Sequence, residues 1–150
     1  MMKWKGSNNA CLAVVACLLS GCQAPPSQDR VCFHQQCYLV EVVSHGAELE
    51  KGLQQRTALP RDHGMLFIFS TSHVQPFWMK DTLIPLDIIW IDYAQRAVHI
   101  EENVPPCEQD PCPSYVPVGK ALYVLEVNAG EAKRMGLQKG DRAEFHLRLR

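Results

Sequence analysis

The sequence has no clear excess of charge of either sign, because its 150 residues include 15 Lys and Arg against 16 Asp and Glu. No basic run appears of the kind that follows a phosphate backbone, so binding to nucleic acid is not expected. A long apolar run is absent as well. The stretch formed by residues 10–19 is too short for a membrane-spanning helix, which needs about 20 apolar residues.

Short motifs of common hydrolases and metalloenzymes are also missing. No serine stands in a G-x-S-x-G nucleophile elbow. The six histidines, at positions 34, 45, 63, 73, 99 and 146, show neither H-x3-H nor H-E-x-x-H spacing. His63 precedes Gly64 in a loop, where a solvated histidine is more common than a catalytic one. We therefore expect no metal and no cofactor, and the absence of a catalytic motif leaves open whether the chain is an enzyme.

The N-terminus has the features of a lipoprotein export signal. Two lysines give it a positive head, residues 10–19 form its apolar core, and a small Ser-Gly pair stands directly before Cys22. This pattern resembles the bacterial lipobox, in which the cysteine is acylated, for example with palmitate, and becomes the first mature residue. We predict a signal peptide over residues 1–21, a lipidated cysteine and flexible tether over residues 22–30, and one globular domain over residues 31–150.

The residues after Cys22 indicate where the lipid would hold the domain. In enterobacterial lipoproteins Asp in the next position is typical of retention at the inner membrane, so Gln23 indicates the outer membrane. The domain would then face the periplasm. Several acyl chains on one cysteine anchor a protein stably. The polar, proline-containing residues 23–30 reach no more than ~28 Å. The expected partner is therefore the membrane, bound through the lipid on Cys22.

Four cysteines remain once Cys22 and the two within the signal peptide are set aside. They form two C-x4-C pairs, and an exported chain meets an oxidising environment in which disulfides persist. Cys32–Cys37 and Cys107–Cys112 are the simplest of the three connectivities. Each bridge would stabilise the fold by about 2 kcal/mol, because the loop it closes is short. The alternative is a four-cysteine zinc site, which the compartment disfavours.

Strand patterns dominate the region after the tether. Apolar and β-branched runs, or strict alternation, predict strands at residues 38–44, 65–69, 88–91, 97–101, 123–127 and 143–150, with a hairpin turn over residues 92–96. Short helices are predicted at residues 47–56 and at residues 129–135, the latter capped by Asn128 and ended by Gly136. The sum is an α+β, mostly β domain: a compact curled or barrel-like sheet with one or two short helices.

Three blocks of sequence carry a family resemblance, and they lie at residues 52–69, 77–87 and 124–141. The second block, Phe-Trp-Met-Lys-Asp-Thr running into Ile-Pro-Leu-Asp, is the most specific. Together the blocks resemble the family catalogued as domain of unknown function 192, also called uncharacterised protein family 0127. Asp81 departs from the family's usual Asn, and Gln54 replaces a frequent Met. The resemblance implies a compact β-rich domain in a family whose members are commonly exported, and it implies no established activity.

Charged residues within apolar segments are the candidates for a site. Lys80 and Asp87 stand at the two ends of a nearly apolar stretch, and Arg56 and Glu126 also have apolar neighbours. Partly desolvated charges need partners. One interpretation is a pocket in which Arg56 and Lys80 hold an anion while Asp87 or Glu126 orients it. The other is an internal network of ion pairs. Trp78 fits either the core or a ligand platform.

These observations lead to a lipid-anchored envelope protein whose domain binds a small ligand, which could be anionic, or an envelope partner. The first alternative is a small hydrolase or modifying enzyme. It would use the Lys80/Asp87/Arg56 cluster, with Asp87, His63 or Glu126 as general base and Lys80 or Arg56 as oxyanion support. The second alternative is a purely structural lipoprotein whose charged cluster is internal.

Overall fold

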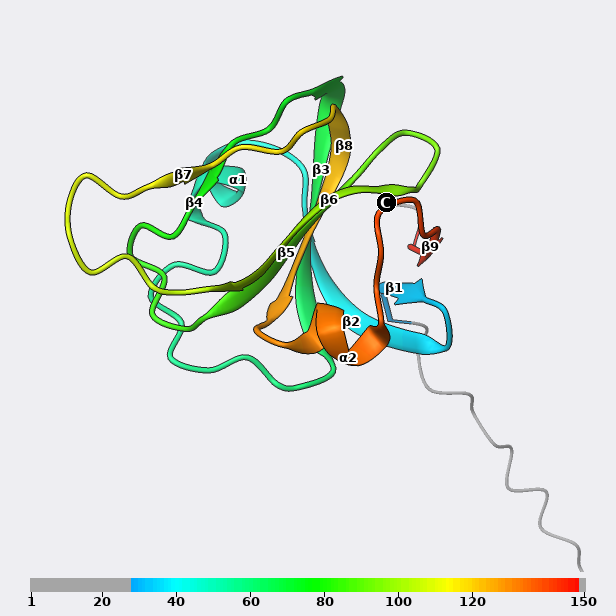
Figure 1. Cartoon of the computed structure of the whole chain (residues 1–150), viewed down its shortest axis with the longest axis horizontal. Coiled ribbons are helices and arrows are strands. Elements are labelled where there is room, and N and C mark those ends of the chain that lie inside the picture. The colour runs from blue at the N-terminus through cyan, green and yellow to red at the C-terminus, as the bar shows by residue number, and fades with distance from the viewer. Residues whose placement is uncertain (1–27, 149–150) are drawn as a thin grey trace, which may run out of the picture.

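Seven strands of the chain join in one curled sheet, which Figure 1 shows nearly edge-on. The computed structural model describes residues 28–148. The sheet has the strand order β6-β5-β8-β3-β2-β1-β9, and a second, two-stranded sheet pairs β4 with β7. The strands are β1 (Arg30–Phe33), β2 (Gln36–Val43), β3 (His63–His73), β4 (Phe77–Trp78), β5 (Leu86–Ile91), β6 (Ala97–Val104), β7 (Ser114–Tyr115), β8 (Ala121–Asn128) and β9 (Ala143–His146); the helices are α1 (Ala47–Lys51) and α2 (Glu131–Met135).

Hairpins and one crossover set the order of the strands. β1 and β2 form a hairpin in which Cys32 and Cys37 are directly opposed, so their disulfide links the two strands across the ladder. β5 and β6 form the second hairpin around the predicted turn at residues 92–96. β2 and β3 pair in parallel, and the connection between them contains α1. The remaining pairings in the large sheet are antiparallel.

The curl brings the two edge strands together at one end. The N–H groups of Gly140 and Ala143 donate to the carbonyl oxygens of Ala97 and Gln95, at 2.7 and 2.8 Å, and Ala97 donates to Asp141 at 2.9 Å. The start of β6 therefore meets the start of β9, and the sheet becomes a half-barrel. This confirms the predicted mostly β fold with a curled sheet and two short helices.

Each face of the sheet buries its own apolar cluster. Figure 1 shows β1, β9 and α2 on one side of the β3–β8 pair, and α1, β4 and β7 on the other. The first side holds the cluster that includes Phe33, Leu125 and Ala132. The second side holds the cluster that includes Leu53 and Trp90. Because side chains alternate along a strand, β8 contributes Leu125 and Val127 to the first cluster and Val124 to the second.

Several element boundaries differ from those predicted. The helix expected over residues 47–56 ends at Lys51, because Gly52 has a positive φ of 46°. α2 begins at Glu131 with Gly130 as its N-cap, while the Asn128 amide instead donates to the carbonyls of Leu59 and Pro60. The short strands β1, β4 and β7 were not predicted, and β1 begins at Arg30, the last residue assigned to the tether.

Both predicted disulfides, Cys32–Cys37 and Cys107–Cys112, are present. The alternative zinc site is therefore wrong, since all four sulfurs are used in pairs. Within residues 28–148 no helix is long and apolar enough to cross a membrane. The predicted signal peptide, Cys22 and most of the tether lie outside the described residues.

Candidate functional site

A pocket of about 200 Å³ opens on the side of the sheet that carries α1 and β4. Its walls come from α1 and the turn after it, from β3, from the segment leading into β4, and from the middle of β8. Its lining combines apolar and aromatic side chains with polar and charged ones in similar proportion. The lining residues are Leu49, Glu50, Lys51, Gly52, Leu53, Gln54, Phe67, Phe69, Gln75, Pro76, Phe77, Trp78, Lys80, Thr82 and Glu126.

Glu126 contributes the buried polar group of this pocket. It lies on the central strand β8, directly opposite Met65 of β3 and Ile88 of β5, two members of the apolar cluster. The residue is only 5% exposed. Its Oε2 atom is buried and has no hydrogen-bond partner within the described part of the chain. Burial raises the pKa of this carboxyl group to about 8, so much of it is protonated at neutral pH.

An acid at this position works against stability. A polar group left buried without a partner costs about 1–3 kcal/mol, and nearly all such groups in native proteins are paired. The neighbouring inward position on the same strand is Val124, which is fully buried in the apolar cluster. An apolar residue would satisfy the packing there equally well. A perturbed carboxyl group in a cavity is therefore a candidate functional group.

Aromatic rings form a fixed wall beside Glu126. The Phe77 ring packs edge-on against Phe67, with centroids 5.0 Å apart, and against Trp90 at 5.8 Å. The Trp90 indole N–H donates to the carbonyl of Gln75 at 2.7 Å, which holds the segment before β4 against the sheet. These contacts keep the wall in place without a ligand, and preformed walls lower the entropic cost of binding.

Gly52 leaves the space between the helix and this wall open. A Cβ atom at this position would lie 3.2 Å from the Phe67 ring and 4.0 Å from Glu126 Oε2. The φ of 46° also favours glycine over residues with a side chain. The turn after α1 thus approaches the carboxyl group closely, and no side chain of this turn residue fills the space between them.

The mouth of the pocket carries charges of both signs. The Lys80 ammonium lies over the Trp78 ring, 5.5 Å from its centroid. A second hollow of about 280 Å³ shares part of its lining with the pocket. Both are lined by Glu50, Lys51, Trp78 and Lys80, and the second hollow is also lined by Asp81. Trp78, Lys80 and Glu126 are thus the predicted site residues that the structure brings to one cavity.

Arg56 lies at a different place. Its guanidinium group donates to both carboxylate oxygens of Glu41, at 2.5 and 2.6 Å, and the pair borders a separate hollow. The hydrogen bonds from Arg56 lower the pKa of the Glu41 carboxyl group. Arg56 and Lys80 therefore do not line a common pocket, and the two-cation anion site proposed from the sequence is not assembled.

Asp87 has a structural role. It is completely buried, and its carboxylate accepts hydrogen bonds from the backbone N–H groups of Asn103, Gly130 and Ala132, at 2.7, 3.1 and 2.7 Å. These bonds join the end of β6 to the start of α2. Asp87 is absent from the pocket lining that includes Lys80. The expected Lys80/Asp87/Arg56 cluster therefore does not form, because each residue has a separate environment.

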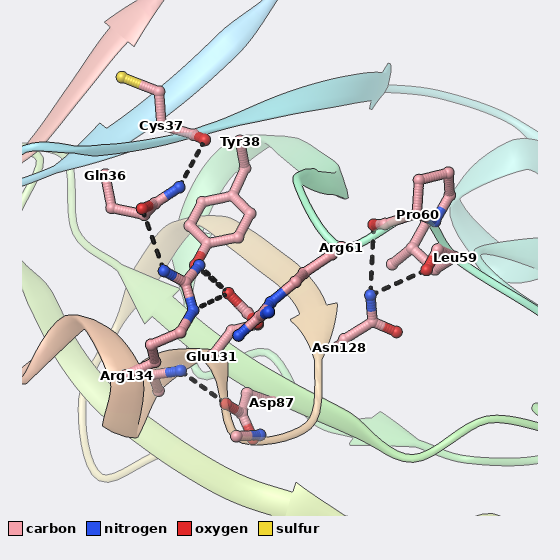
Figure 2. A network of polar contacts seen from close by, with 12 residues as sticks. Gln36, Cys37, Tyr38, Leu59, Pro60, Arg61, Asp87, Asn128, Glu131 and Arg134 are labelled. Atoms are coloured by element: carbon pink, nitrogen blue, oxygen red, sulfur yellow. Dashed lines mark hydrogen bonds and ion pairs between the residues drawn. The ribbon is translucent and has the colours of Figure 1, made fainter.

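A separate ion-pair network surrounds Glu131, and none of its charged members was singled out from the sequence (Figure 2). Glu131 accepts from the Tyr38 hydroxyl at 2.6 Å and from Arg134, and it lies 3.5 Å from Arg61. Although burial raises the Glu131 pKa, these hydrogen bonds outweigh burial and lower it. Burial and the bond to Glu131 raise the Tyr38 pKa. Because every charge here is compensated, the network stabilises the junction of β2 and α2.

Neither His63 nor a metal cluster adds chemistry to the pocket. His63 contacts Asp62 at 2.8 Å and does not line the cavity. Over residues 28–148 no group of three or more His, Cys, Asp or Glu side chains is arranged to hold a metal ion. Sequence reasoning missed the aromatic wall formed by Phe67 and Phe77. The sequence pattern that could have indicated this wall is the alternation of Phe67 and Phe69 in β3, which places both rings on the same face of the strand.

These features define a small, mostly β domain whose curled sheet carries an aromatic pocket with a buried acid. Residues 30–145 match the family of domains of unknown function numbered 192, described as an uncharacterized ACR. The chain belongs to this family. No match is found among curated proteins.

Two solved structures are similar to the chain. A protein of unknown function from Novosphingobium aromaticivorans DSM 12444 is 33% identical with a TM-score of 0.71, and the match covers 77% of this chain and 83% of that one. A protein from Sinorhizobium meliloti 1021, provisionally described as a transcription regulator, is 33% identical with a TM-score of 0.71, covering 79% and 94% of the two chains.

Proposed function

We propose that this chain is a lipid-anchored protein of the bacterial cell envelope whose domain binds a small ligand in the pocket at Glu126. The observation that carries the proposal is the unpartnered Oε2 atom of Glu126, a residue that lines a preformed aromatic cavity. A ligand that supplies a hydrogen-bond partner would remove the cost of burying this atom. Concave sites that combine aromatic and apolar side chains with convergent polar groups are typical of small-molecule binding.

The location rests on the sequence. The segment ending at Cys22 predicts lipidation, and Gln23 favours the outer membrane with the domain facing the periplasm. The two bridges, Cys32–Cys37 and Cys107–Cys112, support an oxidising compartment. In Figure 1 the strand nearest the predicted anchor, β1, and the pocket elements α1 and β4 lie at opposite ends of the domain. This arrangement supports a pocket open to the periplasm.

Catalysis by Glu126 is the second candidate function. A carboxyl group with a pKa of about 8 is suited to proton transfer near neutral pH. The pocket lining includes no Ser, Cys or His, and the hydroxyl of its Thr82 donates to the carbonyl of Lys80 and not to Glu126. Binding without chemistry therefore fits the lining better than hydrolysis. A purely structural role explains neither the cavity nor the acid.

A ligand screen by thermal shift tests the binding proposal. The mature chain in mild detergent is compared with its Glu126→Leu variant, which should be at least as stable because it removes the unpartnered acid. Ligands of the pocket should raise the midpoint of the wild type and leave that of the variant unchanged. Equal responses of the two proteins across the whole screen would contradict the proposal.

Lipidation is tested separately in cells. The wild type should accumulate as an unprocessed precursor when lipoprotein signal peptidase is inhibited, and it should fractionate with the outer membrane when it is not. Cys22→Ser should abolish acylation. A wild type that matures normally under inhibition and remains soluble in the periplasm would contradict the anchor without affecting the pocket.

A further inference from the structure

We propose that the Glu126 pocket selects a small primary or secondary ammonium ion that carries an apolar substituent about the size of one ring. The inference rests on the proposed function, because it names the chemical class of ligand for the same site. It is carried by the juxtaposition of a lone buried carboxyl group, a fixed aromatic wall, and a mouth whose charges cancel.

The charges at the mouth do not favour a ligand of either sign. Glu50 and Asp81 supply two negative groups there, and Lys51 and Lys80 supply two positive groups. Lys51 and Lys80 belong to the lining of the pocket as well, but neither pairs with Glu126, whose Oε2 atom has no partner among the described residues. The charge preference of the cavity is therefore decided by this one carboxyl group, which favours a cation when it is ionised.

An ammonium group satisfies Glu126 in a way that other polar groups do not. It supplies N–H donors for the unpartnered Oε2 atom and a positive charge for the carboxylate. The rings of Phe67 and Phe77 beside the acid add the attraction of aromatic faces for cations. An anionic ligand that approached Glu126 would meet an acid with which no lysine of the lining is paired. A hydroxyl group would supply a donor but leave the carboxyl group uncharged.

The cavity also limits the size of the ligand. A dry cavity of about 150 Å³ holds one benzene molecule, and this pocket measures about 200 Å³. One ring with a short amino-alkyl arm therefore matches the space. Gly52 keeps a side chain out of the space beside Oε2, since a Cβ atom there would lie 4.0 Å from this oxygen and 3.2 Å from the Phe67 ring.

Calorimetric titration with three matched probes tests the inference: 2-phenylethylamine, 2-phenylethanol and 3-phenylpropionate. The mature chain in mild detergent should bind the amine tightest. Glu126→Gln keeps the shape of the side chain and should weaken amine binding by about 100-fold, because it removes one partner of a buried charge pair. Glu102→Gln makes the same change at an exposed acid of β6 that lies outside the pocket lining, and it is the matched control, with a change of less than about twofold.

A proton readout separates the ion pair from a neutral contact. Burial raises the pKa of Glu126 to about 8, so amine binding near pH 7 should release a proton, visible as a binding heat that depends on the buffer. Affinity should rise by about fivefold between pH 7 and pH 8 in the wild type but not in Glu126→Gln. Glu50, Lys51, Lys80 and Asp81 are common to both proteins, so their titration cancels in the comparison.

The outcomes distinguish this inference from the function on which it rests. Binding of 2-phenylethanol or 3-phenylpropionate as tightly as the amine, lost in Glu126→Leu, would overturn the ammonium assignment and leave the binding function standing. Amine binding that is equal in wild type and Glu126→Gln would overturn the assignment as well. Failure of all three probes, together with a ligand screen in which nothing depends on Glu126, would overturn both.

Discussion

Replacing Glu126 by Gln should change how the stability of the fold depends on pH. The native carboxyl group has a pKa of about 8, whereas the ordinary value is 4.5. Between these values the native state holds a proton that the unfolded state has lost. The free energy of unfolding should therefore fall by about 1.4 kcal/mol for each pH unit within this window. The full contribution is present at low pH and is lost as the pH rises towards about 8.

The expected loss is about 3 kcal/mol between pH 4.5 and pH 7. Glu126→Gln has no proton to lose, so its unfolding free energy should stay higher by that amount at the upper end of the range. Urea unfolding followed by tryptophan fluorescence, at four pH values, measures the difference. Histidines and the other acids titrate in both proteins, so their effects cancel when the two curves are subtracted.

Glu50→Gln serves as the matched control, because Glu50 is an exposed acid at the mouth of the same pocket. Its curve should run parallel to that of the wild type. Parallel curves for the wild type and Glu126→Gln would refute the reasoning, since they would mean that the native Glu126 is ionised like an exposed acid.

Three further predictions concern residues that stabilise the fold around the pocket. Asp87→Asn should destabilise the fold by about 3 kcal/mol in urea unfolding, because one oxygen that accepts backbone N–H groups becomes a donor; a loss below about 1 kcal/mol would contradict this role. Gly64→Ala should cost at least ~2 kcal/mol, since its Cβ atom would meet the backbone oxygen of Glu126 at 2.6 Å; an unchanged midpoint would argue against this packing. Replacing Cys32 and Cys37 by Ser should cost about 2 kcal/mol, and peptide mapping of the alkylated wild type should recover the 32–37 link; free thiols at both positions in unreduced protein would contradict the bridge.

Local features of the fold were predictable from the sequence. The disulfides followed from two equal spacings, since residues five apart can meet without help from the rest of the chain. The alternation of Ala143, Phe145 and Leu147 predicted a half-buried strand over residues 143–150. β9 shows the expected alternation of burial but ends at His146, before the last described residues. Gly136 was expected to end α2 and does so in the left-handed conformation. β4 and β7 escaped prediction because each has two residues and depends on pairing with a distant strand.

The sequence by itself determined that Arg56, Asp87 and Glu126 are charges among apolar neighbours, and therefore that each needs an explanation. Only the tertiary structure decided which explanation applies. Arg56, in the connection after α1, pairs with Glu41 of β2. Asp87 accepts hydrogen bonds from N–H groups that lie up to 45 residues away in the sequence. Glu126 is left without a partner for Oε2. Whether a charged side chain finds a partner depends on which distant segments the sheet brings next to it. The residues around one charge in the sequence do not contain this information.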